Sequence, residues 1–145
     1  MPIKTPICDF GQNVHDFELK STDNKVMSLN DVKGENGTLI MFICNHCPYV
    51  KAVVKDIVDD CNELIKIGVN SVAICSNDAK NYPEDSFEKM MEFAKKNKFN
   101  FPYLIDETQI IAKTYDAVCT PDFFGYNNKM ELQYRGRIRE LKDLK

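Results

Sequence analysis

Two cysteines stand where an apolar strand gives way to an amphipathic helix. Cys44 and Cys47 are separated by two residues, and residues 38–43 before them have the length and composition of a buried strand. After them, apolar side chains recur at helical spacing from Val50 to Ile65, which predicts a long helix with one buried face. The start of a helix presents unpaired N–H groups and the positive end of its dipole, and both favour a negative charge. A cysteine at this turn therefore loses its proton easily.

The size and composition of the chain are those of a single globular domain over residues 1–145. Hydrophobic residues make up 43% and charged residues 28%, and 145 residues can bury a core without disulfide staples. The net charge of −3, with no block of like charges, argues against a nucleic-acid or membrane partner.

The N-terminus and the cysteine pattern favour a cytoplasmic protein. Residues 1–6 lack the apolar core of a secretory signal, and no stretch reaches the length of a membrane span. The six cysteines are scattered, and several lie inside core-like elements, which does not fit a loop-rich disulfide framework. Cys61 and Cys75 fall on predicted buried faces, where cysteine behaves as a small hydrophobic side chain.

The remaining elements predict a mixed sheet. Alternating apolar and polar residues indicate a hairpin over 14–29, and a second antiparallel hairpin is predicted over 122–135. Apolar runs indicate buried strands over 71–75 and 101–105. Because consecutive buried strands joined by a helix run parallel, the order of elements predicts an α/β sandwich with a mixed sheet.

Two acidic residues are predicted to begin helices. Asp85 is followed three residues later by Glu88, which is a capping-box pattern, and the next residues carry an apolar stripe. Asp106 and Gln109 form the same kind of pattern before a short helix.

A Cys-x-x-Cys pair between a strand and a helix is typical of thiol redox sites. Residues 42–50 and 120–124 of this chain resemble the thioredoxin-like redoxin group related to the AhpC/TSA thiol-specific antioxidant proteins. Residues 16–19 and 81–83 are also similar to that group, so the resemblance covers nearly the whole chain. It implies an α/β, thioredoxin-like three-layer sandwich with a central mixed sheet, an N-terminal β-hairpin extension and an inserted βα unit. The resemblance also implies a full C-terminal helix that closes the sheet, whereas residues 139–145 provide barely two turns. We therefore expect either a shortened C-terminal helix or a partner that covers the closing surface.

The resemblance implies a substrate-binding loop as well. In this superfamily a cis-proline faces the dithiol, and the matching residue here is Pro121, preceded by Thr120. Tyr49, in the first helical turn, is a further candidate for lining the substrate groove. Cys119 is either an additional redox thiol or a buried cysteine at the entry to a strand, and both interpretations stay open.

Pro48 favours one order of attack. Proline has no N–H and is preferred at the first helical position, which it occupies if Cys47 caps the helix. We therefore predict that Cys47 is the nucleophile and Cys44 the resolving thiol, while the conventional order, with Cys44 attacking, stays open. A similarity to the Thr-x-x-Cys-Pro of peroxiredoxins supports this order. His46 lies beside both thiols, and an imidazole that favours thiolate makes such a pair more oxidising; the alternative is a solvated loop residue.

The leading hypothesis is a thiol-disulfide oxidoreductase that works through its own dithiol, with no cofactor. Its partners would be a protein or small-molecule disulfide and an external thiol donor. The alternative is a peroxiredoxin-like thiol peroxidase, although the chain lacks the Pro-x-x-x-Thr that peroxiredoxins carry before the attacking cysteine. A third hypothesis is soft-metal (copper) binding by Cys44, His46 and Cys47, for which His15 is the only other histidine.

Overall fold

The computed structural model describes residues 14–45, 48–76, 83–115 and 122–136, which form one seven-stranded sheet with helices on both faces. The strands are β1 (Glu18–Ser21), β2 (Val26–Ser28), β3 (Gly37–Phe42), β4 (Val69–Cys75), β5 (Tyr103–Ile105), β6 (Asp122–Asn127) and β7 (Leu132–Gly136). The helices are α1 (Leu29–Val32), α2 (Pro48–Lys66), the 3-10 turn η1 (Pro83–Asp85), α3 (Phe87–Lys96) and α4 (Ile110–Thr114).

The sheet has the order β2-β1-β5-β4-β3-β6-β7. Its centre is parallel, since β3 pairs with β4 and β4 with β5 in the same direction. The β1–β2 hairpin is added antiparallel at β5, and the β6–β7 hairpin is added antiparallel at β3. The predicted α/β class, the mixed sheet and both hairpins are therefore confirmed.

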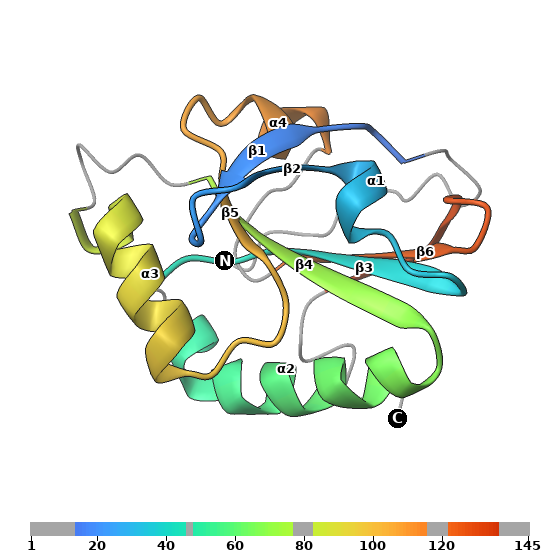
Figure 1. Ribbon diagram of the computed structural model, residues 1–145, viewed down its shortest axis with the longest axis horizontal. Helices are drawn as coiled ribbons and strands as arrows, with labels where there is room; N and C mark the ends of the chain where they lie inside the picture. The colour runs from blue at the N-terminus through green and yellow to red at the C-terminus, as the bar shows by residue number, and fades with distance from the viewer. Residues whose placement is uncertain (1–13, 46–47, 77–82, 116–121, 137–145) are drawn as a thin grey trace, which may run out of the picture.

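Two apolar clusters hold the layers together. Successive side chains of a strand point to opposite faces, so Met41 of β3 packs with α2 and α3 while Phe42 packs on the face that α1 and α4 cover. Figure 1 shows the same arrangement, with α2 and α3 below the sheet and α1 and α4 above it. The Cys-x-x-Cys segment follows β3, and its first residue, Cys44, packs in the cluster on the α2 and α3 side.

The helix before β5 begins one residue later than predicted. Ser86, not Asp85, caps α3, and its side chain accepts a hydrogen bond from the Lys89 N–H at 3.3 Å. Asp85 instead closes η1, and its side chain is buried. The predicted capping role of Asp85 is therefore wrong, because the 3-10 turn carries the chain past Asp85 before α3 starts.

Asp106 partly fulfils its predicted role. Its carboxylate accepts a hydrogen bond from the N–H of Ala112 at 3.0 Å, so it satisfies a donor in the first turn of α4 from outside the helix.

Within the described ranges, no helix has the combination of length and apolarity needed to cross a membrane.

Candidate functional site

The first cysteine of the predicted dithiol lies just beyond the carboxyl end of β3. Cys44 is 1% exposed and belongs to the apolar cluster that includes Val50 of α2. Helix α2 begins at Pro48, which agrees with the prediction that this proline takes the first helical position. A strand end and a helix start thus flank the Cys-x-x-Cys segment, as expected from the sequence.

The other predicted site residues are not tested by the structure. The backbone of Tyr49 lies in α2, but its side chain falls outside the described part of the chain. The remaining candidates also fall outside it: His46, Cys47, Cys119, Thr120 and Pro121. Their roles stay predictions.

The sheet register brings two of the predicted segments to one edge. Phe42 at the end of β3 pairs with Asp122 at the start of β6. The chain after Phe42 and the chain before Asp122 therefore leave the sheet at the same edge. The first contains the Cys-x-x-Cys segment, and the second contains Thr120 and Pro121.

Asn45, the residue after Cys44, is held from two sides by residues distant in the sequence. Its backbone N–H donates to Oδ1 of Asp85 at 2.7 Å, and its side-chain Oδ1 accepts from the phenol of Tyr103 at 2.8 Å. Asn45 is 6% exposed, and Asp85 and Tyr103 are each 1% exposed. Because such bonds are sheltered from water, breaking one leaves a buried polar group unsatisfied.

Electrostatics at this buried site keep the phenol protonated. Burial raises the pKa of Tyr103 well above its ordinary value, and the neighbouring Cys75, Asp85 and Cys44 raise it further. A protonated phenol is the form that can donate to Asn45. The structure therefore gathers the Tyr103 phenol and the Asp85 carboxylate around Asn45, with the thiols of Cys44 and Cys75 close enough to influence the phenol.

Sequence reasoning missed this arrangement. It placed Asp85 at a helix cap and treated Tyr103 as part of an apolar strand. One signal was present, because a tyrosine in a buried strand needs a partner for its hydroxyl. Nothing in the local sequence identified that partner as Asn45.

Cys61 and Cys75 are buried, as predicted for structural cysteines. Cys61 lies in α2 and faces the same cluster as Met41. Burial raises the pKa of the Cys61 thiol from 9.0 to about 11, while the nearby Ser71 hydroxyl lowers it and the Asp60 carboxylate adds to the rise. Cys61 is consequently a poor nucleophile near neutral pH.

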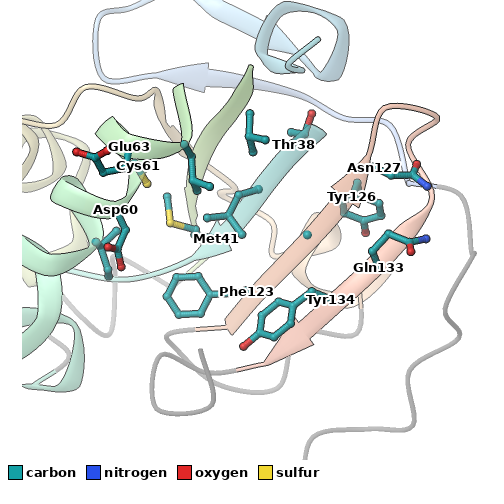
Figure 2. A pocket seen from close by; sticks show the side chains of 15 residues that line it. Thr38, Met41, Asp60, Cys61, Glu63, Phe123, Tyr126, Asn127, Gln133 and Tyr134 are labelled. Carbon is teal, nitrogen blue, oxygen red and sulfur yellow. The ribbon is translucent and has the colours of Figure 1, made fainter. Parts of the chain in front are cut away.

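Two hollows differ in their relation to the dithiol. One, of about 530 Å³, is lined by α2, β3, β6 and β7, and Figure 2 shows Met41, Cys61, Phe123 and Tyr134 around it. Its walls are mainly apolar, and neither described residue of the Cys-x-x-Cys segment lines it. The other, of about 450 Å³, includes Asn45 and is bounded by α2 and α3. Of these two hollows, the second is the one lined by a described residue of the Cys-x-x-Cys segment.

The structure gives no support to the metal-binding hypothesis within residues 14–45, 48–76, 83–115 and 122–136. In these ranges no three His, Cys, Asp or Glu side chains lie close enough together to bind one metal ion. Of the three ligands that the hypothesis names, only Cys44 belongs to these ranges.

Comparison with solved structures shows relatives of the same fold. A crystal structure of an uncharacterized conserved protein from Geobacillus kaustophilus is 46% identical, with a TM-score of 0.90 over 94% of this chain and 73% of that one. Two proteins from Mycobacterium tuberculosis, each 17% identical, share the fold alone. A secreted disulfide oxidoreductase homologous to E. coli DsbE has a TM-score of 0.68 over 81% of this chain and 80% of its own. A peroxidoxin has a TM-score of 0.72 over 88% and 84%.

No curated protein matches the sequence significantly. The family profile described as AhpC/TSA matches residues 10–141. That match spans the sheet, the Cys-x-x-Cys segment and the flanking helices, and it confirms the resemblance read from the sequence. The chain therefore belongs to the AhpC/TSA family of thioredoxin-like redoxins.

Proposed function

We propose that this AhpC/TSA-family protein is a thiol-disulfide oxidoreductase that acts through Cys44 and Cys47. Membership of the family assigns it a thiol-based redox function. The observation that carries the finer proposal is the position of Cys44, which is buried between the end of β3 and the start of α2 at Pro48. If Cys47 caps the helix that starts at Pro48, the free N–H groups of the first helical turn would stabilise its thiolate.

Burial also supports the predicted order of attack. A thiol that is 1% exposed cannot meet the disulfide of a large substrate first, so Cys44 suits the resolving role. Attack then falls to Cys47, whose thiolate the α2 dipole would stabilise. This order agrees with the preference of proline for the first helical position.

The reaction proceeds by two exchanges. The Cys47 thiolate attacks one substrate sulfur and forms a mixed disulfide, and the other substrate sulfur leaves as a thiolate that takes up a proton. Cys44 gives its proton to solvent and attacks the Cys47 sulfur, which releases the second substrate thiol. The substrate disulfide gains two electrons, and the Cys44–Cys47 pair becomes a disulfide that an external dithiol donor reduces.

The sheet register supports the assignment of the substrate-binding residues. Because β3 ends and β6 begins at one edge, the segment with Thr120 and Pro121 is connected to the sheet beside the dithiol segment. Thr120 and Pro121 are proposed to bind the substrate backbone, and Tyr49 is proposed to line the groove. His46 is proposed to favour the thiolate of its neighbours.

Stopped-flow reduction of glutathione disulfide, followed by mass spectrometry of the products, tests the proposal. Cys47→Ser should abolish reduction, while Cys44→Ser should accumulate a mixed disulfide at Cys47. Cys61→Ser, at a buried cysteine of α2, is the matched control and should react like the wild type. Loss of the first attack in Cys44→Ser would show that the order is reversed.

If the protein were a thiol peroxidase, it would consume peroxide in place of reducing a disulfide. Peroxide would oxidise the Cys47 thiolate to a sulfenic acid, and Cys44 would condense with it to release water. The proposal is wrong if the reduced wild type consumes peroxide rapidly and reduces no disulfide.

A further inference from the structure

Asp85 is a buried acidic residue at the end of η1. The side-chain cap of α3 comes from Ser86 and not from Asp85. The Asp85 carboxylate turns toward the segment after β3 and accepts the Asn45 N–H at 2.7 Å. Burying a carboxylate costs free energy, and hydrogen bonds to it must offset that cost. A carboxylate kept at 1% exposure beside a redox segment therefore calls for a functional explanation.

The bond acts on the peptide group that joins Cys44 to Asn45. Because the Asn45 N–H belongs to that group, its bond to Asp85 fixes the orientation of the peptide plane. The orientation of the plane in turn limits the direction of the Cys44 side chain. The Asp85 carboxylate is thus bonded to the peptide group that directly follows the Cα atom of Cys44.

Tyr103 supplies a second anchor from another element. Its hydroxyl, at the start of β5, donates to Asn45 Oδ1 at 2.8 Å. Asn45 is therefore held through its backbone by η1 and through its side chain by β5. Both hydrogen bonds end on Asn45, so Asp85 and Tyr103 lie in one buried cluster beside the residue that follows Cys44.

We propose that Asp85 is a positioning residue of the dithiol, which holds the Cys44–Asn45 peptide group and whose negative charge makes the Cys44–Cys47 pair more reducing. This inference rests on the proposed thiol-disulfide function. A nearby negative charge disfavours a thiolate, and weaker stabilisation of the thiolate makes a dithiol a stronger reductant.

Other charged or ionisable groups lie near Asn45 and its two partners. The ionisable neighbours of the cluster are Asp85 from η1, Tyr103 from β5 and Cys75 from β4. The hollow that Asn45 lines adds Lys51 from α2 and Lys89, Glu92 and Lys96 from α3. The three lysines favour a thiolate, whereas Asp85 opposes it from the buried side. Among the described residues, removing the Asp85 charge should therefore make surroundings that are already net positive more positive still.

The test compares two substitutions that each remove one buried carboxylate charge. Asp85→Asn keeps an oxygen that can accept the Asn45 N–H, so mainly the charge is lost. Asp106→Asn is the matched control, because Asp106 is equally buried but bonds to Ser76 and Ala112. The measurements are the pH profile of dithiol alkylation and the equilibrium constant of the pair with glutathione.

Asp85→Asn should lower the midpoint of the pH profile of dithiol alkylation by about one pH unit, because the thiolate no longer faces a negative charge. It should also shift the glutathione equilibrium about tenfold toward the reduced pair, which corresponds to about 30 mV. Asp106→Asn should leave both at wild-type values. The charge role is overturned if the two variants behave alike or if Asp85→Asn changes neither quantity.

A measurement on the wild type keeps the inference testable if Asp85→Asn does not fold. Native-state hydrogen exchange should show the Asn45 amide protected at least about hundredfold relative to an unstructured peptide, because Asp85 holds it away from water. Exchange at the unprotected rate would overturn the positioning role. The alkylation profile and the glutathione equilibrium report on the dithiol, and hydrogen exchange reports on the Asn45 amide, so all three remain informative if the protein reduces no disulfide substrate.

Discussion

The phenol oxygen of Tyr103 lies 2.8 Å from Oδ1 of Asn45 and connects residues 58 positions apart in the sequence. The bond ties β5 to the segment that follows β3, across the intervening strand β4. Asn45, the residue next to Cys44, is therefore anchored to the parallel core of the sheet and does not depend on short-range contacts alone.

Tyr103→Phe should lower the free energy of unfolding by about 1–3 kcal/mol, because Asn45 Oδ1 loses a donor in a buried position. Urea unfolding followed by far-UV circular dichroism measures this change. Tyr115→Phe is the matched control: its hydroxyl bonds the backbone carbonyl of His15, which is only half-buried, so water can replace the donor. An equal or smaller loss for Tyr103→Phe would contradict the anchoring role.

Cys61 should resist alkylation while the folded protein is intact. Its pKa of about 11, raised from 9.0 by burial, makes its thiolate about a hundredfold scarcer at a pH of about 8 than in an unfolded chain. Iodoacetamide labelling followed by peptide mapping should find Cys61 unmodified without denaturant and modified in urea. Rapid labelling of Cys61 in the folded protein would contradict its burial.

The same shift predicts a decline in stability at high pH. Because the folded-state pKa of Cys61 lies above the unfolded value, its contribution is complete below a pH of about 9 and is lost as pH rises toward about 11. The loss is up to about 1.4 kcal/mol per pH unit in that window. Unfolding curves across this range should decline less steeply for Cys61→Ser than for the wild type; parallel declines would refute the assignment.

Gly68→Ala should destabilise the turn between α2 and β4. Gly68 has a φ of +81°, and an added Cβ would lie 2.4 Å from the side-chain nitrogen of Asn36. That nitrogen donates to the carbonyl of Ile67 at 2.8 Å, so its displacement would also break a hydrogen bond. We expect a loss of about 1–3 kcal/mol by thermal or urea unfolding. Lys66→Ala, at an exposed position of the same helix end, should change stability by less than about 0.5 kcal/mol.

Lys98→Gly should have the opposite effect at the end of α3. Lys98 has a φ of +56°, the left-handed conformation that glycine adopts without a steric penalty. We expect a gain of up to about 1 kcal/mol in the free energy of unfolding. Lys95→Gly, inside the last turn of α3, should instead cost about 1 kcal/mol. If both substitutions destabilise equally, the backbone conformation at Lys98 does not govern stability there.

Local patterns in the sequence determined much of the fold. The apolar run over residues 38–43 and the helical spacing after Val50 identified β3 and α2, and Pro48 marked the first residue of that helix. These features depend on periodicity and on the missing N–H of proline, which are properties of neighbouring residues. The same patterns identified the segment that contains the dithiol.

The tertiary structure alone decided what surrounds that segment. Asp85 and Tyr103 lie 40 and 58 residues beyond Asn45, and neither has a sequence pattern that names Asn45 as its partner. Asp85 even matched a helix-capping pattern, which Ser86 fulfils in the folded chain. The partner of a buried polar group depends on which strand ends and turns meet in the sheet, and that meeting is a property of the whole fold.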